Sequence, residues 1–138
     1  MFTNRFGGAW LEGGVAPITL TTTPYAFDLY NHYQSGPGVL AEAGKLLVQV
    51  PGYYLATFNL SFNGAAGVIY FAQMREDGVA SAFISSAEGI ASGGRVNLSL
   101  IAGGHPDKDA IIQVYVYCNQ AVAQIFTPTH AQFSVVNL

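Results

Sequence analysis

The side chains that could carry acid–base or metal chemistry are few in this chain and stand far apart. Its three histidines, His32, His105 and His130, form no H-x-H or H-E-x-x-H pattern, the spacings at which a strand or a helix presents paired metal ligands. No G-x-S-x-G segment is present to expose a nucleophilic serine. These patterns favour a protein that is not an enzyme and that holds no cofactor or metal, unless the fold brings the histidines together.

Two aspartates, Asp107 and Asp109, follow His105 in the segment GGHPDKDA. Carboxylate and carbonyl oxygens are the ligands that Ca²⁺ takes, so one interpretation is a calcium site. The other, which we favour, is a polar hairpin turn between two strands, because Asp side chains make the hydrogen bonds that close turns.

Cys118 is the single cysteine, so an intramolecular disulfide and a zinc–cysteine cluster are both excluded. It alternates with Ile112, Val114 and Val116. This alternation predicts a buried thiol on the core face of a strand.

The chain is unusually poor in charge. Charged residues make up 9% of its 138 residues, against roughly 25% in ordinary soluble domains. The five basic residues are scattered and outnumbered by eight acidic ones, which argues against a nucleic-acid partner. Either the surface is polar but uncharged, or, as we favour, much of it is buried against other chains.

Two long segments, 46–74 and 110–138, contain no charged residue at all. Both alternate at period two and are interrupted by Gly, Pro, Asn or Gln, so neither is expected to span a membrane. The first residues, MFTNRFGGAW, lack the apolar region of a secretory signal. We therefore expect a chain that is made in a cytoplasm, is not exported and has no membrane partner.

Strand patterns dominate the chain. Apolar or β-branched runs alternate with Gly-, Pro- and Asn-rich turns, one of them at 127–130, and no helical stripe extends over ten residues. Residues 39–45 could form at most one helical turn. We expect about ten strands, at 16–23, 26–33, 45–50, 53–62, 67–76, 79–86, 95–102, 110–118, 122–127 and 131–138. This pattern predicts an all-β, single-domain antiparallel sandwich, barrel or jelly roll.

The segment VQVPGYYLATFNLSFNG, residues 48–64, has two faces that differ in kind. Tyr54, Phe58, Leu60 and Phe62 lie on one face and are expected in the core. The opposite face begins with Tyr53, Leu55 and Thr57 and carries no charge.

The first fourteen residues hold four glycines and three aromatic residues without a strand pattern. We expect residues 1–14 to form an arm in front of a domain at 15–138. Its aromatic side chains, Phe2, Phe6 and Trp10, either fold back onto their own domain or dock on another protein, where buried aromatics often dominate the binding energy.

The spacing of Gly52, Tyr54, Phe58 and Phe62 resembles a strand motif of the tumour necrosis factor-like and complement globular-head jelly rolls. The segment RVNLSLIAGGHPDKDAIIQVYV resembles their strand–turn–strand unit, with Asp109 at the turn, and AQFSVVNL resembles their closing strand, with Phe133 at its aromatic position. The resemblance covers residues 15–138 and implies a jelly roll that forms homotrimers.

The resemblance also implies a role for each face of the inner sheet. Its outer face would line the threefold axis, through Tyr53, Leu55, Thr57, Gln132, Ser134, Val136 and Leu138. The core would hold Tyr54, Phe58, Leu60, Phe62, Val114, Val116, Phe133 and Val135.

A small jelly-roll head with a short aromatic arm is similar to the trimeric capsid decoration, or cement, proteins of tailed bacteriophages. This likeness implies a virion structural protein, assembled in the host cytoplasm, that binds the major capsid protein on the outer capsid surface and stabilises it. The docking arm would then use Phe2, Arg5, Phe6 and Trp10. Two alternatives stay open: a receptor-binding or fibre-tip head of a phage, and a carbohydrate- or small-ligand-binding jelly roll that uses some of the tyrosines at 25, 30, 33, 115 and 117.

Overall fold

Alternating apolar side chains build the strands of the chain, which a computed structural model describes over residues 4–138. Twelve strands lie in this part: β1 Phe6–Leu11, β2 Ile18–Leu20, β3 Tyr25–Ala26, β4 His32–Ser35, β5 Val39–Glu42, β6 Lys45–Val48, β7 Tyr54–Gly64, β8 Ile69–Glu76, β9 Ile84–Glu88, β10 Gly94–Gly104, β11 Ala110–Cys118 and β12 Gln124–Asn137. The predicted all-β class is therefore confirmed. None of the described residues belongs to a helix that could cross a membrane.

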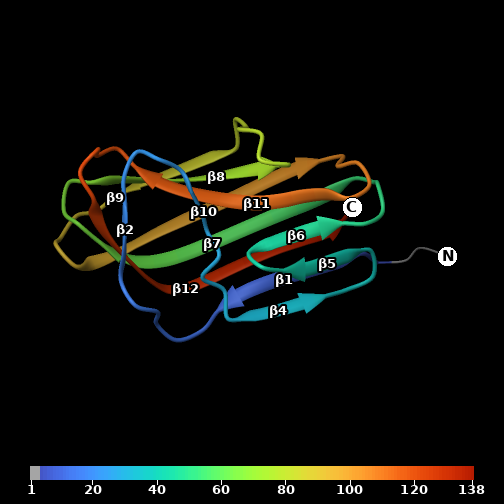
Figure 1. The fold of residues 1–138 in the computed structure, drawn as a ribbon, viewed down its shortest axis with the longest axis horizontal. Coiled ribbons are helices and arrows are strands. Elements are labelled where there is room, and N and C mark those ends of the chain that lie inside the picture. Colours follow the sequence, from blue (N-terminus) through green and yellow to red (C-terminus); the bar gives the residue numbers. More distant parts are fainter. Residues whose placement is uncertain (1–3) are drawn as a thin grey trace.

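The strands form two antiparallel sheets that face each other (Figure 1). Sheet A has the order β10-β7-β12-β1-β4, with β2 paired to β12. Sheet B has the order β5-β6-β11-β8-β9, with β3 paired to β11. Neighbours in each sheet come from distant parts of the sequence, and this sandwich with crossing connections confirms the expected jelly roll.

Aromatic side chains from both halves of the chain fill the space between the sheets. Phe58 of β7 meets Phe133 of β12 edge to face, with ring centres 6.2 Å apart, and Phe27 packs against Phe58 at 5.8 Å. Such edge-to-face pairs add to the free energy gained by burial alone. All eight residues expected in the core are buried: Tyr54, Phe58, Leu60, Phe62, Val114, Val116, Phe133 and Val135.

The expected arm is wrong for the part that the structure describes. Phe6–Leu11 forms β1, which lies inside sheet A between β12 and β4. Its two glycines hide the alternation that would reveal a strand. Gly7 is needed for packing, because a Cβ there would lie 2.5 Å from Cγ1 of Val39. The Arg5 amide donates a hydrogen bond to the side-chain oxygen of Asn137, and the Arg5 carbonyl accepts one from the Asn137 amide, so Arg5 is held against the same sheet. Phe2 lies outside the described residues.

The segment predicted as a helical turn is instead a β-hairpin. β5 and β6 are joined by Ala43 and Gly44, whose φ angles are 48° and 79°. Two consecutive residues with positive φ are typical of a type I′ turn, whose twist matches that of the flanking strands. The Asn-Gly or Asp-Gly pair that usually indicates such a turn is absent here, so the sequence pattern did not reveal the hairpin.

The predicted turn at 127–130 lies inside a long strand. β12 runs through it with a bulge between Pro128 and His130, where the extra residue, Thr129, donates a hydrogen bond to the Ser61 carbonyl at 3.1 Å. A bulge lets a strand accept a proline and a shift of register without ending. The expected strands 122–127 and 131–138 are therefore one.

Tyr30 carries the one buried side-chain polar atom of residues 4–138 that has no hydrogen-bond partner in the protein. Its ring stacks on Phe133 at 6.2 Å, and burial raises the pKa of its hydroxyl well above the ordinary value. Tyr70, also buried, is fully satisfied: its hydroxyl donates to the Ile125 carbonyl at 2.7 Å and accepts from the Ala65 amide at 2.9 Å.

This contrast yields a matched pair of substitutions. Tyr30→Phe should raise the free energy of unfolding by about 1 kcal/mol, because it removes an unpaired buried hydroxyl without leaving a partner behind. Tyr70→Phe should lower it by about 2 kcal/mol, because it strands a buried amide and a carbonyl. Denaturant unfolding of both variants measures the two changes, and a loss of stability in Tyr30→Phe would show that its hydroxyl is bonded in solution.

The close approach at Gly7 gives a second prediction. Gly7→Ala should lower the free energy of unfolding by about 1–3 kcal/mol, because the new methyl group overpacks against the fully buried Val39. Gly14→Ala, where a Cβ meets nothing within 4 Å, is the control and should be close to neutral. Equal stability of the two variants in denaturant unfolding would contradict the placement of β1 inside the sheet.

Candidate functional site

The outer face of sheet A is a continuous surface without a charged residue. It consists of the side chains that alternate with the core residues: Leu55, Thr57, Asn59 and Ser61 on β7, Asn97, Ser99, Ile101 and Gly103 on β10, His130, Gln132, Ser134 and Val136 on β12, Phe6, Gly8 and Trp10 on β1, and His32 and Gln34 on β4. None of these is Asp, Glu, Lys or Arg. The surface crosses five strands and ends at Arg95 on β10.

One end of this face is apolar. The strand register places Phe6, Val136 and Leu55 side by side across β1, β12 and β7, and Ile101 lies in the next row on β10. Ile101 is 69% exposed. Tyr53 and Leu138 extend the same end, at 68% and 77% exposure, and the Leu138 amide donates to the Tyr53 carbonyl at 2.8 Å. Large apolar side chains gathered in this way on one face mark an interaction surface.

The other end of the face is polar, yet its hydroxyls are already paired across the strands. Ser99 donates to the Asn59 side-chain oxygen at 2.8 Å, and Ser61 donates to that of Asn97 at 2.6 Å. Near the middle, the hydroxyls of Thr57 and Ser134 share a hydrogen bond of 2.8 Å. Because a paired hydroxyl loses little when water is removed, this face can be covered at a small desolvation cost.

A hollow of about 180 Å³ lies over Gly8, where the face lacks a side chain. Its walls include Phe6, Trp10, Gln132 and Val136. A Cβ on Gly8 would lie 3.1 Å from the Phe133 carbonyl, so the strands leave little room for one. The hollow is large enough to hold a side chain from outside the molecule.

At the edge of the face Trp10 is held by its neighbours. Its indole stacks on the His32 ring, with centres 5.2 Å apart and planes 10° apart. Nε2 of His32 lies 3.8 Å from the Glu12 carboxylate. These contacts fix the orientation of Trp10 as one wall of the hollow.

The predicted interface residues gather on this face. Leu55, Thr57, Gln132, Ser134 and Val136 belong to it, while Tyr53 and Leu138 lie directly beside it. Phe6 and Trp10, expected in a docking arm, belong to the same face. Contact of these residues with other copies stays a prediction.

Sequence reasoning missed three features of this surface, namely Gly8, Ile101 and the β4 pair His32 and Gln34. The signal for Ile101 was available, since it alternates with the core residues Leu98 and Leu100.

The histidines and aspartates do not assemble into a site in the described part of the chain. Residues 4–138 hold no group of three or more His, Cys, Asp and Glu side chains that could bind a metal. Asp107 and Asp109 lie in the turn between β10 and β11, where the Asp109 amide donates to the Val48 carbonyl at 2.7 Å and Asp109 has a φ of 65°. Cys118 is 1% exposed, as the alternation predicted.

Comparison with known proteins defines the fold. No family model matches the chain, and no curated protein sequence is similar to it. Among solved structures, the chain is similar to murine APRIL, with 14% identity, a TM-score of 0.63 and coverage of 97% of this chain and 100% of the other. It is also similar to Eiger TNF from S. frugiperda, at 12% identity and a TM-score of 0.63, covering 97% and 93% of the two chains.

The globular domain of zebrafish complement 1qA gives a TM-score of 0.64 at 12% identity, with 97% of both chains covered. These likenesses show that the chain has the tumour necrosis factor-like jelly-roll fold, which the sequence resemblance implied.

Proposed function

We propose that the chain assembles into a homotrimer through the outer face of sheet A, and that the trimer is a non-catalytic structural protein that decorates a bacteriophage capsid. The observation that carries the assembly is the charge-free face across five strands. The capsid role rests on the sequence resemblance to phage decoration proteins and on the surfaces that trimerisation leaves free.

The composition of the face favours burial. Covering apolar surface gains about 25 cal/mol per Å², and the apolar end supplies Phe6, Leu55, Ile101 and Val136 for this purpose. Removing charged groups from water would cost several kcal/mol each, but this face carries none. An obligate interface resembles a domain core cut in half, and the apolar end of the outer side of sheet A has such a composition.

A projection and a hollow stand at opposite sides of one registered row. Across the sheet, this row runs from Ile101 on β10 through Thr57 on β7 and Ser134 on β12 to Gly8 on β1. When Ile101 of one copy enters the Gly8 hollow of the next, the contact joins two different patches. Such heterologous contacts close into rings, and a ring of three is the assembly that the family resemblance implies.

Trimerisation leaves one end of the sandwich free to meet a partner. The loops between β7 and β8, β9 and β10, and β11 and β12 lie together at the end opposite the chain termini (Figure 1). Residues 65–68, 89–93 and 119–123 of these loops contain no charge, and Ile90 and Val122 project with 94% and 73% exposure. Three copies of such a tip would bind a repeating protein surface with avidity.

The assembly is tested by placing a charge on the face. Ile101→Asp and Leu55→Asp should each disrupt the trimer, because an interface would bury an unpaired carboxylate. Ile84→Asp is the matched control, since Ile84 is 46% exposed on β9 of the other sheet. Light scattering should give three times the 14.6 kDa chain mass for the wild type and the control, and the monomer mass for the two variants. A monomeric wild type would overturn the proposal.

The capsid role is tested separately, on a trimer that stays intact. The double variant Ile90→Asp/Val122→Asp should keep the trimer mass but lose cosedimentation with capsids of the phage that encodes the chain, while Ala80→Asp, in the loop after β8, should keep both. Electron microscopy of the virion should place the protein on the capsid shell. Density at a fibre tip instead would favour the receptor-binding alternative and leave the trimer unaffected.

A further inference from the structure

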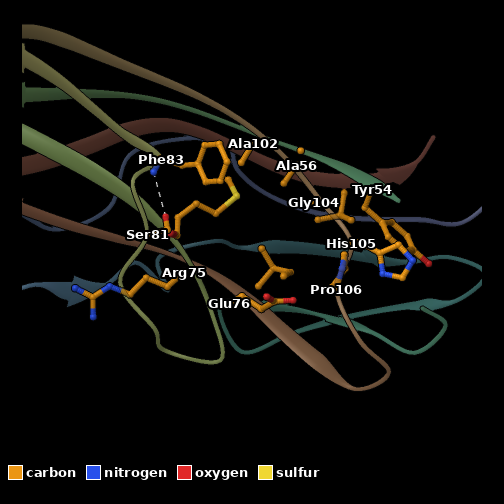
Figure 2. A pocket seen from close by; sticks show the side chains of 14 residues that line it. Tyr54, Ala56, Arg75, Glu76, Ser81, Phe83, Ala102, Gly104, His105 and Pro106 are labelled. Carbon is orange, nitrogen blue, oxygen red and sulfur yellow. Dashed lines mark hydrogen bonds between the residues drawn. The ribbon is translucent and has the colours of Figure 1, made fainter. Parts of the chain in front are cut away.

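A cavity of about 160 Å³ lies between the two sheets, away from the outer face of sheet A. Its wall is formed by Tyr54, Ala56, Ala102 and Val135 of sheet A and by Met74 and Ile112 of sheet B, and Pro106 and Phe83 lie at its margin. The exposed residues Glu76, Phe83 and His105 mark its mouth, beside the edge strand β10 (Figure 2).

The cavity follows from small residues in one registered row. Ala102, Ala56 and Val135 stand side by side across β10, β7 and β12. The next row on the same face holds Leu100, Phe58 and Phe133, which fill the space between the sheets. Protein interiors are normally packed with few voids larger than a water molecule, so the row of small residues leaves room that the core elsewhere does not.

The polar groups of the wall are satisfied by the protein or turned away. The Tyr54 hydroxyl donates to the Val50 carbonyl at 2.7 Å. Ser81 donates to the Met74 carbonyl and accepts from the Phe83 amide. Arg75 extends away from the cavity, with its guanidinium 4.3 Å from the centre of the Tyr115 ring (Figure 2). Thus no unpaired buried polar side chain of the described residues faces the cavity.

We propose that this cavity is a binding site for a small, uncharged, apolar molecule of about the size of benzene. A molecule of this size would bury much of its surface against the mostly apolar wall, and burial of apolar surface gains about 25 cal/mol per Å². The volume is too small for a hydrated sugar ring or for a peptide segment, and the polar side chains Glu76 and His105 lie at the mouth rather than between the sheets. Its mouth opens beside β10 and Phe83, so binding does not require the self-association face.

The chain offers a local probe for the test. It contains two methionines, and Met74 lines the cavity whereas Met1 stands at the N-terminus. Full-length protein labelled with ¹³C at the methionine methyl groups is titrated with benzene. The Met74 methyl resonance should shift by ring-current effects and saturate, and the unfolding temperature should rise by about 3 °C near saturation.

Variants that fill the cavity provide the control. Ala102→Leu should abolish the benzene-dependent shift of Met74, and the smaller Ala102→Val should weaken it at least tenfold. Ala121→Leu, on an exposed loop at the other end of the sandwich, should bind benzene as the wild type does. If Ala102→Leu does not fold, the weaker benzene binding expected of Ala102→Val still tests the proposal. An unmoved Met74 resonance in the wild type, or an equal shift in a folded Ala102→Leu or Ala102→Val variant, would overturn the proposal.

Discussion

The pairing of β7 with β12 is the interaction on which the rest of the structure depends. These two long strands pair in the middle of sheet A, and their inward side chains Phe58 and Phe133 meet edge to face in the core. β10 and β1 then add to their free edges, and Phe27 packs on Phe58 from the segment between β3 and β4. Because side chains alternate along each strand, the residues between those that face the core must point to the outer face of the sheet.

That outer side explains the composition of the whole chain. A sheet that faces water on one side normally alternates apolar and polar residues. The outward positions of β7 and β12 are Leu, Thr, Asn, Ser, His, Gln and Val, so they are partly polar but carry no Asp, Glu, Lys or Arg. Hydroxyl pairs such as Thr57 and Ser134 satisfy the polar groups within the sheet itself. The uncharged surface expected from the sequence therefore includes the whole of this face, together with the loops at the end opposite the termini.

Much of the fold could be predicted, because unbroken alternation in long strands such as β7, β10 and β11 indicates which side chains face the core and which face outward. The errors have local causes. β1 escaped notice because Gly7 and Gly8 remove the side chains that alternation is read from, although Gly7 is required by the close approach of Val39. The β5–β6 turn uses Ala43 with φ at 48° in place of Asn or Asp, and the bulge at Pro128–His130 looks like a strand end. The candidate face was predictable on β7 and β12, but its hollow was not, because a hollow depends on which strands become neighbours.

Two hollows of the molecule have a common origin in small residues. Each arises where a registered row contains small residues, Gly8 on the outer face and Ala56 with Ala102 on the inner face. The outer hollow is open along a broad uncharged surface, so a side chain carried by another macromolecule can reach it. The inner one lies between the two sheets and opens past the edge of β10, beside Phe83 and His105. Val135 lines both, which means that a single strand, β12, separates them. The Val135 side chain is buried in the core, so a substitution there alters the inner cavity, whereas a substitution at Gly8 alters the outer hollow independently.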